Sequence, residues 1–171
     1  MLSLALVVTG CGIGASGPVA VTFPPESFGP SAGTTAAVAA TRAQIAIALR
    51  PQGLGLIDPR VPFRPAESPR FAAAPRAVFQ VVLPDDPSHG FISVYEFPDQ
   101  AAASGAANEQ AAYVASGPGR VQFPPDSRFV IRQLDTTVVF FAWSPANSPD
   151  SRTGQIQAAL ETLGIAIAVP R

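Results

Sequence analysis

Residues 137–143 read TVVFFAW, a run made mostly of β-branched and aromatic residues. β-Branched and aromatic side chains favour a strand, and a continuous apolar run is typical of a strand that is buried on both faces. Residues 128–134, RFVIRQL, come just before it, and the short link Leu134-Asp135-Thr136 predicts that the two segments form a hairpin. We therefore place residues 137–143 at the centre of a sheet.

A second hairpin is predicted upstream. Residues 77–83 form a buried strand and residues 91–97 its partner, and the turn-forming residues 84–90, PDDPSHG, join them. Along the partner strand, Phe91 and Tyr95 fall on one face, and Ile92 and Val94 fall on the other. The sheet is therefore expected to be covered in part on both sides.

Three helices are predicted around the hairpins. Thr34-Thr35 would cap a helix at residues 36–49, and Asp99 would cap an alanine-rich helix at residues 100–115. A third helix at residues 152–163 has apolar residues spaced i, i+3, i+4 and i+7.

The remaining segments are short or irregular. Residues 54–57 and 165–169 are expected to be short extended pieces. Residues 60–75 contain Pro62, Pro65, Pro69 and Pro75, which predicts a surface connection without a regular element. The order of the elements predicts one α+β domain over residues 34–171, with an antiparallel or mixed sheet of about four to five strands and about two to three helices packed mainly on one face.

The N-terminus carries a short motif. The apolar run LSLALVV at residues 2–8 is followed by Thr9-Gly10-Cys11, and Cys11 is the only cysteine. Val8 to Cys11 resembles the lipobox of bacterial lipoproteins, which implies that residues 1–10 are a signal peptide and that Cys11 is lipidated and anchored in the cell membrane on its extracytoplasmic face. No Lys or Arg precedes the apolar run, so we expect the signal peptide to lack its N-terminal part. The alternative is that residues 2–8 form a buried strand and that Cys11 is a small core residue.

Residues 12–33 are rich in Gly and Pro. Such a composition buries too little apolar area to offset the entropy of ordering, and it predicts a flexible tether. A diacylglycerol thioether with an N-acyl chain, as the resemblance implies, would anchor Cys11 stably, whereas one acyl chain is marginal.

A wider resemblance covers roughly residues 35–164. It rests on VYEFPD at residues 94–99, the alanine-rich helix that follows, Pro124-Pro125, and VVFF at residues 138–141. These features resemble a group of small uncharacterised bacterial lipoproteins. The resemblance implies a location and a fold, and it carries no activity.

Charge argues against a nucleic-acid partner. The net charge is -1 at pH 7, whereas nucleic-acid binding requires clustered cations. Residues 42–76 hold six arginines and residues 77–119 hold five acids and no base. The arginines could form a basic arm that meets anionic lipid or a polymeric anion near the anchor. Alternatively, the two segments face each other across the fold or are solvated surface.

Few residues suggest catalysis. His89 is the only histidine, and Asp85 and Asp86 lie close to it in sequence, so the three could bind a metal or supply a general base. A hairpin loop would contain such residues in any case. One Cys and one His exclude a zinc site of the Cys/His kind in a monomer. Glu96 and Asp99 could form a carboxylate pair for glycoside chemistry, although Glu96 is better explained as an exposed strand position and Asp99 as a helix cap.

The sequence VTFPPES at residues 21–27 recurs as VQFPPDS at residues 121–127. Each copy is either a polyproline ligand for a partner or a proline-rich turn.

These observations predict a lipid-anchored, non-enzymatic binding or structural module without a cofactor. Its partners would be the membrane through the lipid anchor and an envelope protein or a small molecule. The alternative is a metal-dependent or hydrolytic enzyme that uses Asp85, Asp86 and His89.

Overall fold

The computed structural model describes residues 35–170. The signal peptide and tether predicted for residues 1–33, including Cys11, lie outside the described residues.

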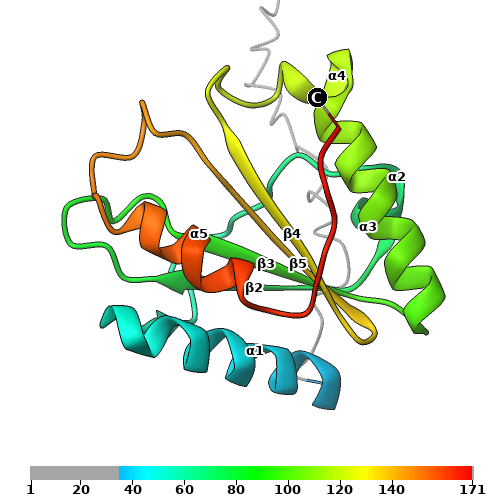
Figure 1. The fold of residues 1–171 in the computed structure, drawn as a ribbon, viewed down its shortest axis with the longest axis horizontal. Helices are drawn as coiled ribbons and strands as arrows, with labels where there is room; N and C mark the ends of the chain where they lie inside the picture. The colour runs from blue at the N-terminus through cyan, green and yellow to red at the C-terminus, as the bar shows by residue number, and fades with distance from the viewer. Residues whose placement is uncertain (1–34, 171) are drawn as a thin grey trace, which may run out of the picture.

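Figure 1 shows the arrangement of the helices and strands. The helices are α1 (Ala36–Leu49), the single 3-10 turn η1 (Arg50–Gln52), α2 (Pro69–Ala73), α3 (Gln100–Ala115), α4 (Gly117–Arg120) and α5 (Thr153–Glu161). The strands are β1 (Leu56–Ile57), β2 (Arg76–Val81), β3 (Phe91–Glu96), β4 (Arg128–Leu134), β5 (Thr137–Trp143) and β6 (Ile165–Ala166).

All the described strands belong to one antiparallel sheet. Six strands follow the order β1-β2-β3-β5-β4-β6. The predicted α+β fold is confirmed, and the six described strands slightly exceed the expected four to five because both edges are completed by strands of two residues. Strand β5 lies between β3 and β4, and Val138 to Phe141 are at most 1% exposed. The segment TVVFFAW therefore occupies the centre of the sheet, as predicted.

Helices cover both faces of the sheet (Figure 1). Helices α1 and α5 pack against each other on one face, where Ile45 and Leu160 contact the core. Helices α2 and α3 cover the other face, where Phe71 and Ala107 are fully buried. The helices were expected mainly on one face, but apolar side chains on both faces of β3 and β5 require two layers.

Capping residues explain where the two long helices begin. Thr35 Oγ1 accepts a hydrogen bond from Val38 N, and Asp99 Oδ1 accepts one from Ala102 N at 2.7 Å. Both side chains satisfy backbone donors that lack a partner within the first helical turn.

The prediction that residues 60–75 lack a regular element is wrong. Pro69 begins helix α2 after Ser68, and Phe71 is 0% exposed in the core. Proline suits the first helical position because its missing N–H would have no intrahelical partner there. Residues 60–68, called the proline-rich segment below, remain without helix or strand.

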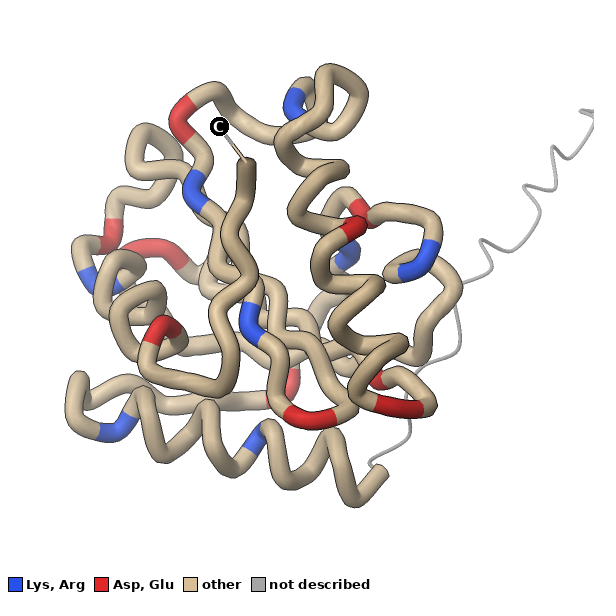
Figure 2. Tube along the Cα trace, turned by 45° about the vertical axis from the view of Figure 1, so that its right-hand side comes forward, with Lys and Arg blue, Asp and Glu red and all other residues tan. Residues whose placement is uncertain are grey.

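The arginines of residues 42–76 do not form a continuous basic arm. In the view of Figure 2 the described cationic residues are spread over separate parts of the trace. Arg70 pairs with Glu109 of α3 at 3.0 Å, and Arg42 pairs with Asp58 at 3.5 Å. The pair of Arg70 and Glu109 joins the arginine-rich segment to the acidic one, as the second interpretation of the charges anticipates.

Within residues 35–170, no helix is both long and apolar enough to cross a bilayer.

Candidate binding pocket

A pocket of about 290 Å³ opens on the α2/α3 face of the sheet. Its floor includes Phe91 of β3 with Phe140 and Ala142 of β5. Its walls are the proline-rich segment, the loop between α4 and β4, and the loop between β5 and α5. The pocket therefore combines segments that are far apart in the sequence.

Aromatic rings form one side of the pocket. Phe63 of the proline-rich segment stacks on Phe91 with ring centroids 4.4 Å apart and an interplanar angle of 7°. Phe123 meets Phe129 edge-on at 4.9 Å, and Phe129 in turn lies 6.4 Å from Phe140. Because each ring is held by another ring, this wall is preformed.

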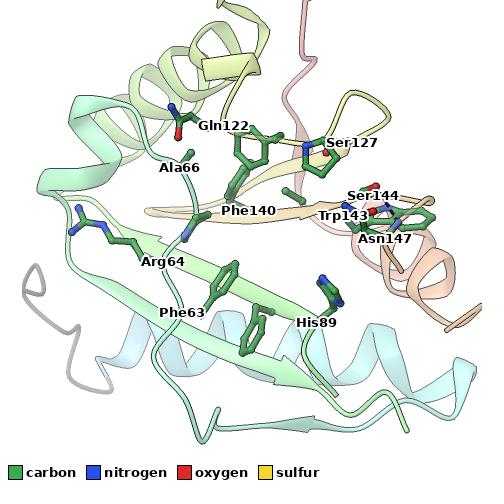
Figure 3. Close-up of a pocket in the computed structure, with 15 residues that line it drawn as sticks. Phe63, Arg64, Ala66, His89, Gln122, Ser127, Phe140, Trp143, Ser144 and Asn147 are labelled. Atoms are coloured by element: carbon green, nitrogen blue, oxygen red, sulfur yellow. Dashed lines mark hydrogen bonds between the residues drawn. The ribbon is translucent and has the colours of Figure 1, made fainter. Parts of the chain in front are cut away.

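Polar side chains lie on the opposite side. Figure 3 shows the imidazole of His89 directed toward Trp143, Ser144 and Asn147. His89 Nδ1 lies 2.5 Å from Asp86 Oδ1, and the Asp86 side chain is 5% exposed. The pocket thus has an apolar side and a polar side.

A second carboxylate stabilises the polar side from behind. Asp126 Oδ1 accepts from Ser144 Oγ at 2.6 Å, and Asp126 Oδ2 accepts from Ala146 N at 2.7 Å. The hydrogen bond from Ser144, followed by that from Ala146, lowers the pKa of Asp126. Asp126 therefore stays ionised and connects the α4–β4 loop to the β5–α5 loop.

Glu67 holds the proline-rich segment against the sheet. Its side chain is 2% exposed, and it accepts from Arg64 Nε at 2.7 Å, from the Arg76 guanidinium and from the Tyr95 hydroxyl. Burial, followed by the charge of Glu67, raises the pKa of Tyr95 well above its ordinary value. The phenol therefore remains a hydrogen-bond donor at neutral pH.

Gln110 of α3 holds the same segment by its amide. Gln110 Oε1 accepts from Ser68 N at 2.6 Å, and Nε2 donates to Ala66 O at 3.0 Å. The side chain is 0% exposed, so these bonds satisfy buried backbone groups. Helix α3 and Glu67 together fix the wall that carries Phe63.

The loop of His89 is also fixed. Gln80 Nε2 donates to Pro87 O and to His89 O, each at 3.0 Å. Gly90 has φ +82, and a Cβ there would lie 2.6 Å from Val81 O, so glycine is required where the loop returns to β3.

Asp150 ties this loop to α5. Its carboxylate accepts from Asp85 N at 3.3 Å and from Arg152 Nη2 at 2.5 Å. The hydrogen bonds from the Arg152 side chain are the main cause that lowers the pKa of Asp150 from 3.8 to about 2.

The structure brings only part of the predicted loop site together. Asp86 and His89 are paired, but Asp85 is 78% exposed and faces Arg152 at 3.4 Å. Within residues 35–170, no group of three or more His, Cys, Asp and Glu side chains could hold a metal ion.

The other two sequence candidates have structural partners. Asp99 caps α3, and Glu96 Oε2 accepts from Thr35 Oγ1 at 2.9 Å. Residues 121–127, the second copy of the repeated sequence, form a turn in which Ser127 N donates to Pro124 O. Phe123 of this copy lines the pocket.

The pocket was not predicted from the sequence. Phe63, Phe123 and Asn147 come from three separate irregular segments that only the folded chain brings together. One signal was present: Phe63 is an aromatic residue between two prolines of a segment that was expected to be surface.

Searches against protein-family models, curated proteins and solved structures found no significant match to this chain.

Proposed function

We propose that this chain is a lipid-anchored, non-enzymatic binding module on the extracytoplasmic face of a membrane, and that the pocket beside Phe63 is its ligand site. The main observation that supports a binding function is the pocket itself. It combines an aromatic side with a few converging polar groups in about 290 Å³, and this is the usual character of small-molecule sites.

The proposed anchor rests on the sequence. Val8 to Cys11, at the end of an apolar run, resemble a lipobox, and residues rich in Gly and Pro separate Cys11 from α1. A tether of that composition would let the domain bind its ligand away from the lipid surface.

The anchor is tested by Cys11→Ser. The wild-type chain, produced in a bacterium that processes lipoproteins and with a basic extension that completes the signal peptide, should fractionate with membranes and carry acyl mass on its N-terminal peptide. Cys11→Ser should lose both, and Ser16→Ala should lose neither. A wild-type chain with no acyl mass and the same membrane partition as Cys11→Ser would refute the anchor.

The pocket is tested with N-phenyl-1-naphthylamine, a neutral dye whose emission rises in apolar surroundings. Wild type should bind one dye molecule saturably. Ala142→Leu should weaken binding at least about tenfold, because the added side chain occupies the floor. Ala146→Leu, an exposed position of the neighbouring loop, is the matched control and should bind as wild type. The absence of saturable binding to wild type would refute the ligand site.

One observation favours a second function, hydrolysis. Asp86 and His89 form a carboxylate–imidazole pair at the pocket, an arrangement that orients a general base. This candidate predicts hydrolysis of p-nitrophenyl esters above the blank rate, abolished in His89→Ala. A metal-dependent form of it predicts stoichiometric metal that is lost on the same substitution.

A further inference from the structure

We propose that the pocket selects an uncharged aromatic compound with a hydroxyl group on its ring, and that His89 Nε2 recognises the hydroxyl. This inference rests on the proposed binding function and specifies the chemical class of its ligand. It depends on the orientation of His89, on the rings opposite it and on the charges around the pocket.

The orientation of His89 leaves one nitrogen for a ligand. A carboxylate can only accept, so the 2.5 Å contact with Asp86 places a proton on Nδ1. Within residues 35–170, Nε2 makes no hydrogen bond, and the His89 side chain is 46% exposed. Nε2 is therefore free to meet a ligand in the pocket.

A hydroxyl group suits Nε2 in either charge state of the imidazole. Neutral His89 with its proton on Nδ1 offers a lone pair on Nε2, and the hydroxyl can donate to it. Protonated His89 offers an N–H, and the hydroxyl oxygen can accept from it. A ligand carboxylate would be matched by the protonated form alone.

The opposite side of the pocket suits an aromatic body. Phe63 lies across the pocket from His89 in Figure 3. Phe63, Phe91 and Phe140 present ring surface and no polar atom to a ligand, and contacts between aromatic rings add to the burial of apolar area. A volume of about 290 Å³ fits a ligand of one to a few rings.

The charges disfavour an anion. Arg64 is the only Lys or Arg among the described lining residues, and Glu67 already binds its Nε. Figure 3 shows its guanidinium pointing away from Phe63 and His89. Asp86 and Asp126 lie behind the polar side, where their negative charges would repel a carboxylate.

The same two carboxylates do not form a cation site. Neither lines the pocket, because Asp86 is turned to His89 and Asp126 to Ser144 and Ala146. Because Phe63 and Phe91 are stacked, one face of each ring is covered by the other ring, and less ring surface is left for a cation. A neutral compound is therefore the best match.

The test compares three probes of one size: 2-naphthol, naphthalene and 2-naphthoate, measured by equilibrium dialysis at neutral pH. The hydroxyl preference is the dissociation constant of naphthalene divided by that of 2-naphthol. Wild type should bind 2-naphthol most tightly of the three. His89→Phe, which keeps a ring but removes Nε2, should lower the hydroxyl preference about five- to tenfold, the usual effect of one hydrogen bond.

Two controls keep the result interpretable. Gln122→Ala alters a lining residue on the side away from His89 in Figure 3 and should keep the wild-type preference. N-Phenyl-1-naphthylamine should still bind to His89→Phe, which shows that the pocket has formed. If the dye does not bind to His89→Phe, His89→Leu, whose side chain also has no hydrogen-bonding atom, is measured in its place with the same expectation.

The outcomes separate the two proposals. If the dye does not bind to wild type, the ligand site itself fails. If the dye binds but the hydroxyl preference is the same in wild type and in the His89 variant, only the hydroxyl recognition is refuted. Tighter binding of 2-naphthoate than of 2-naphthol would also refute it, as would tighter binding of a cationic probe, the 2-naphthyltrimethylammonium ion, measured by the same dialysis.

Discussion

At the scale of single residues, the carboxyl group of Asp150 makes the free energy of unfolding depend on pH. Its lowered pKa, about 2 against an ordinary 3.8, shows that folding favours the carboxylate, mainly through Arg152. A group whose pKa falls on folding stabilises the native state fully above its unfolded pKa, and this contribution disappears as the pH falls through the folded value. For Asp150 the loss spans about pH 4 to pH 2.

We therefore expect Asp150→Asn to flatten the pH dependence of stability. The variant should be less stable than wild type at pH 7, and the difference should shrink as the pH falls from about 4 to 2. Urea unfolding at a series of pH values, followed by Trp143 fluorescence, measures both effects. Asp58→Asn is the control, because Asp58 is 80% exposed and its pair with Arg42 is open to solvent. A constant difference between variant and wild type across the series would contradict the role of Asp150.

Glu67 shows why a single buried carboxylate can shape a site. Two arginines and a tyrosine converge on it, which offsets the cost of taking its charge out of water. From the sequence alone Glu67 was one of two acids in an arginine-rich segment. Nothing in its neighbours indicates that Tyr95, 28 residues away, would donate to it.

At the scale of the elements, α3 depends on small side chains. The buried face of α3 is made mainly of alanines, and Ala103, Ala106 and Ala107 are 0% exposed. The helix can therefore approach the sheet closely, in a core packed to the usual density of protein interiors.

Ala107→Leu should destabilise the domain by about 1–3 kcal/mol, because the added carbons have no space between α3 and the sheet. Ala112→Leu on the exposed face of the same helix should change stability by less than about 0.5 kcal/mol. Chemical denaturation of both variants measures the difference. Equal stability of the two variants would mean that α3 does not pack as closely as the structure shows.

Elements with strong local signals were predicted well. The expected bounds of α1, α3, β4 and β5 coincide with the observed ones. Caps at Thr35 and Asp99 and the continuous apolar run of β5 are local properties, so they can be read from neighbouring residues. The α5 helix is shorter at both ends than expected.

Elements that depend on tertiary contacts were predicted poorly. Helix α2 was missed because the four prolines of residues 60–75 argued against a regular element, and because Phe71 is buried through long-range contacts that include Tyr95 and Phe140. A strand was expected over residues 165–169, yet β6 ends at Ala166, and beyond it Ile167 N donates to Ile131 O of β4 at 3.1 Å. The same distinction holds for the candidate site. Asp86 and His89 are close in sequence, so their pairing could be predicted, whereas the residues that line the pocket are brought together only by the fold.

At the scale of the whole molecule, one sheet serves two cores. Ile45 belongs to the core on the α1/α5 face, and Phe71 belongs to the core on the α2/α3 face. Strands β3 and β5 contribute side chains to both cores. Loss of either core would therefore expose one face of the strands that support the other core. The described residues are therefore expected to unfold as one unit.

Ile45→Ala should cost about 2–5 kcal/mol and Phe71→Ala about 3–5 kcal/mol, the usual range for such truncations. Each variant should unfold in one transition that is the same by Trp143 fluorescence and by far-UV circular dichroism. Ile47→Ala is the surface control, since Ile47 is 62% exposed. Two separated transitions in either core variant would show that the cores unfold independently.

The proline-rich segment has a consequence for the rate of binding. Glu67, Gln110 and the stacked ring of Phe91 hold this wall before any ligand arrives. A preformed wall requires no closing step, so little entropy remains to be lost when a ligand enters. The observed association rate should then rise in proportion to ligand concentration, without the plateau that a slow rearrangement would impose.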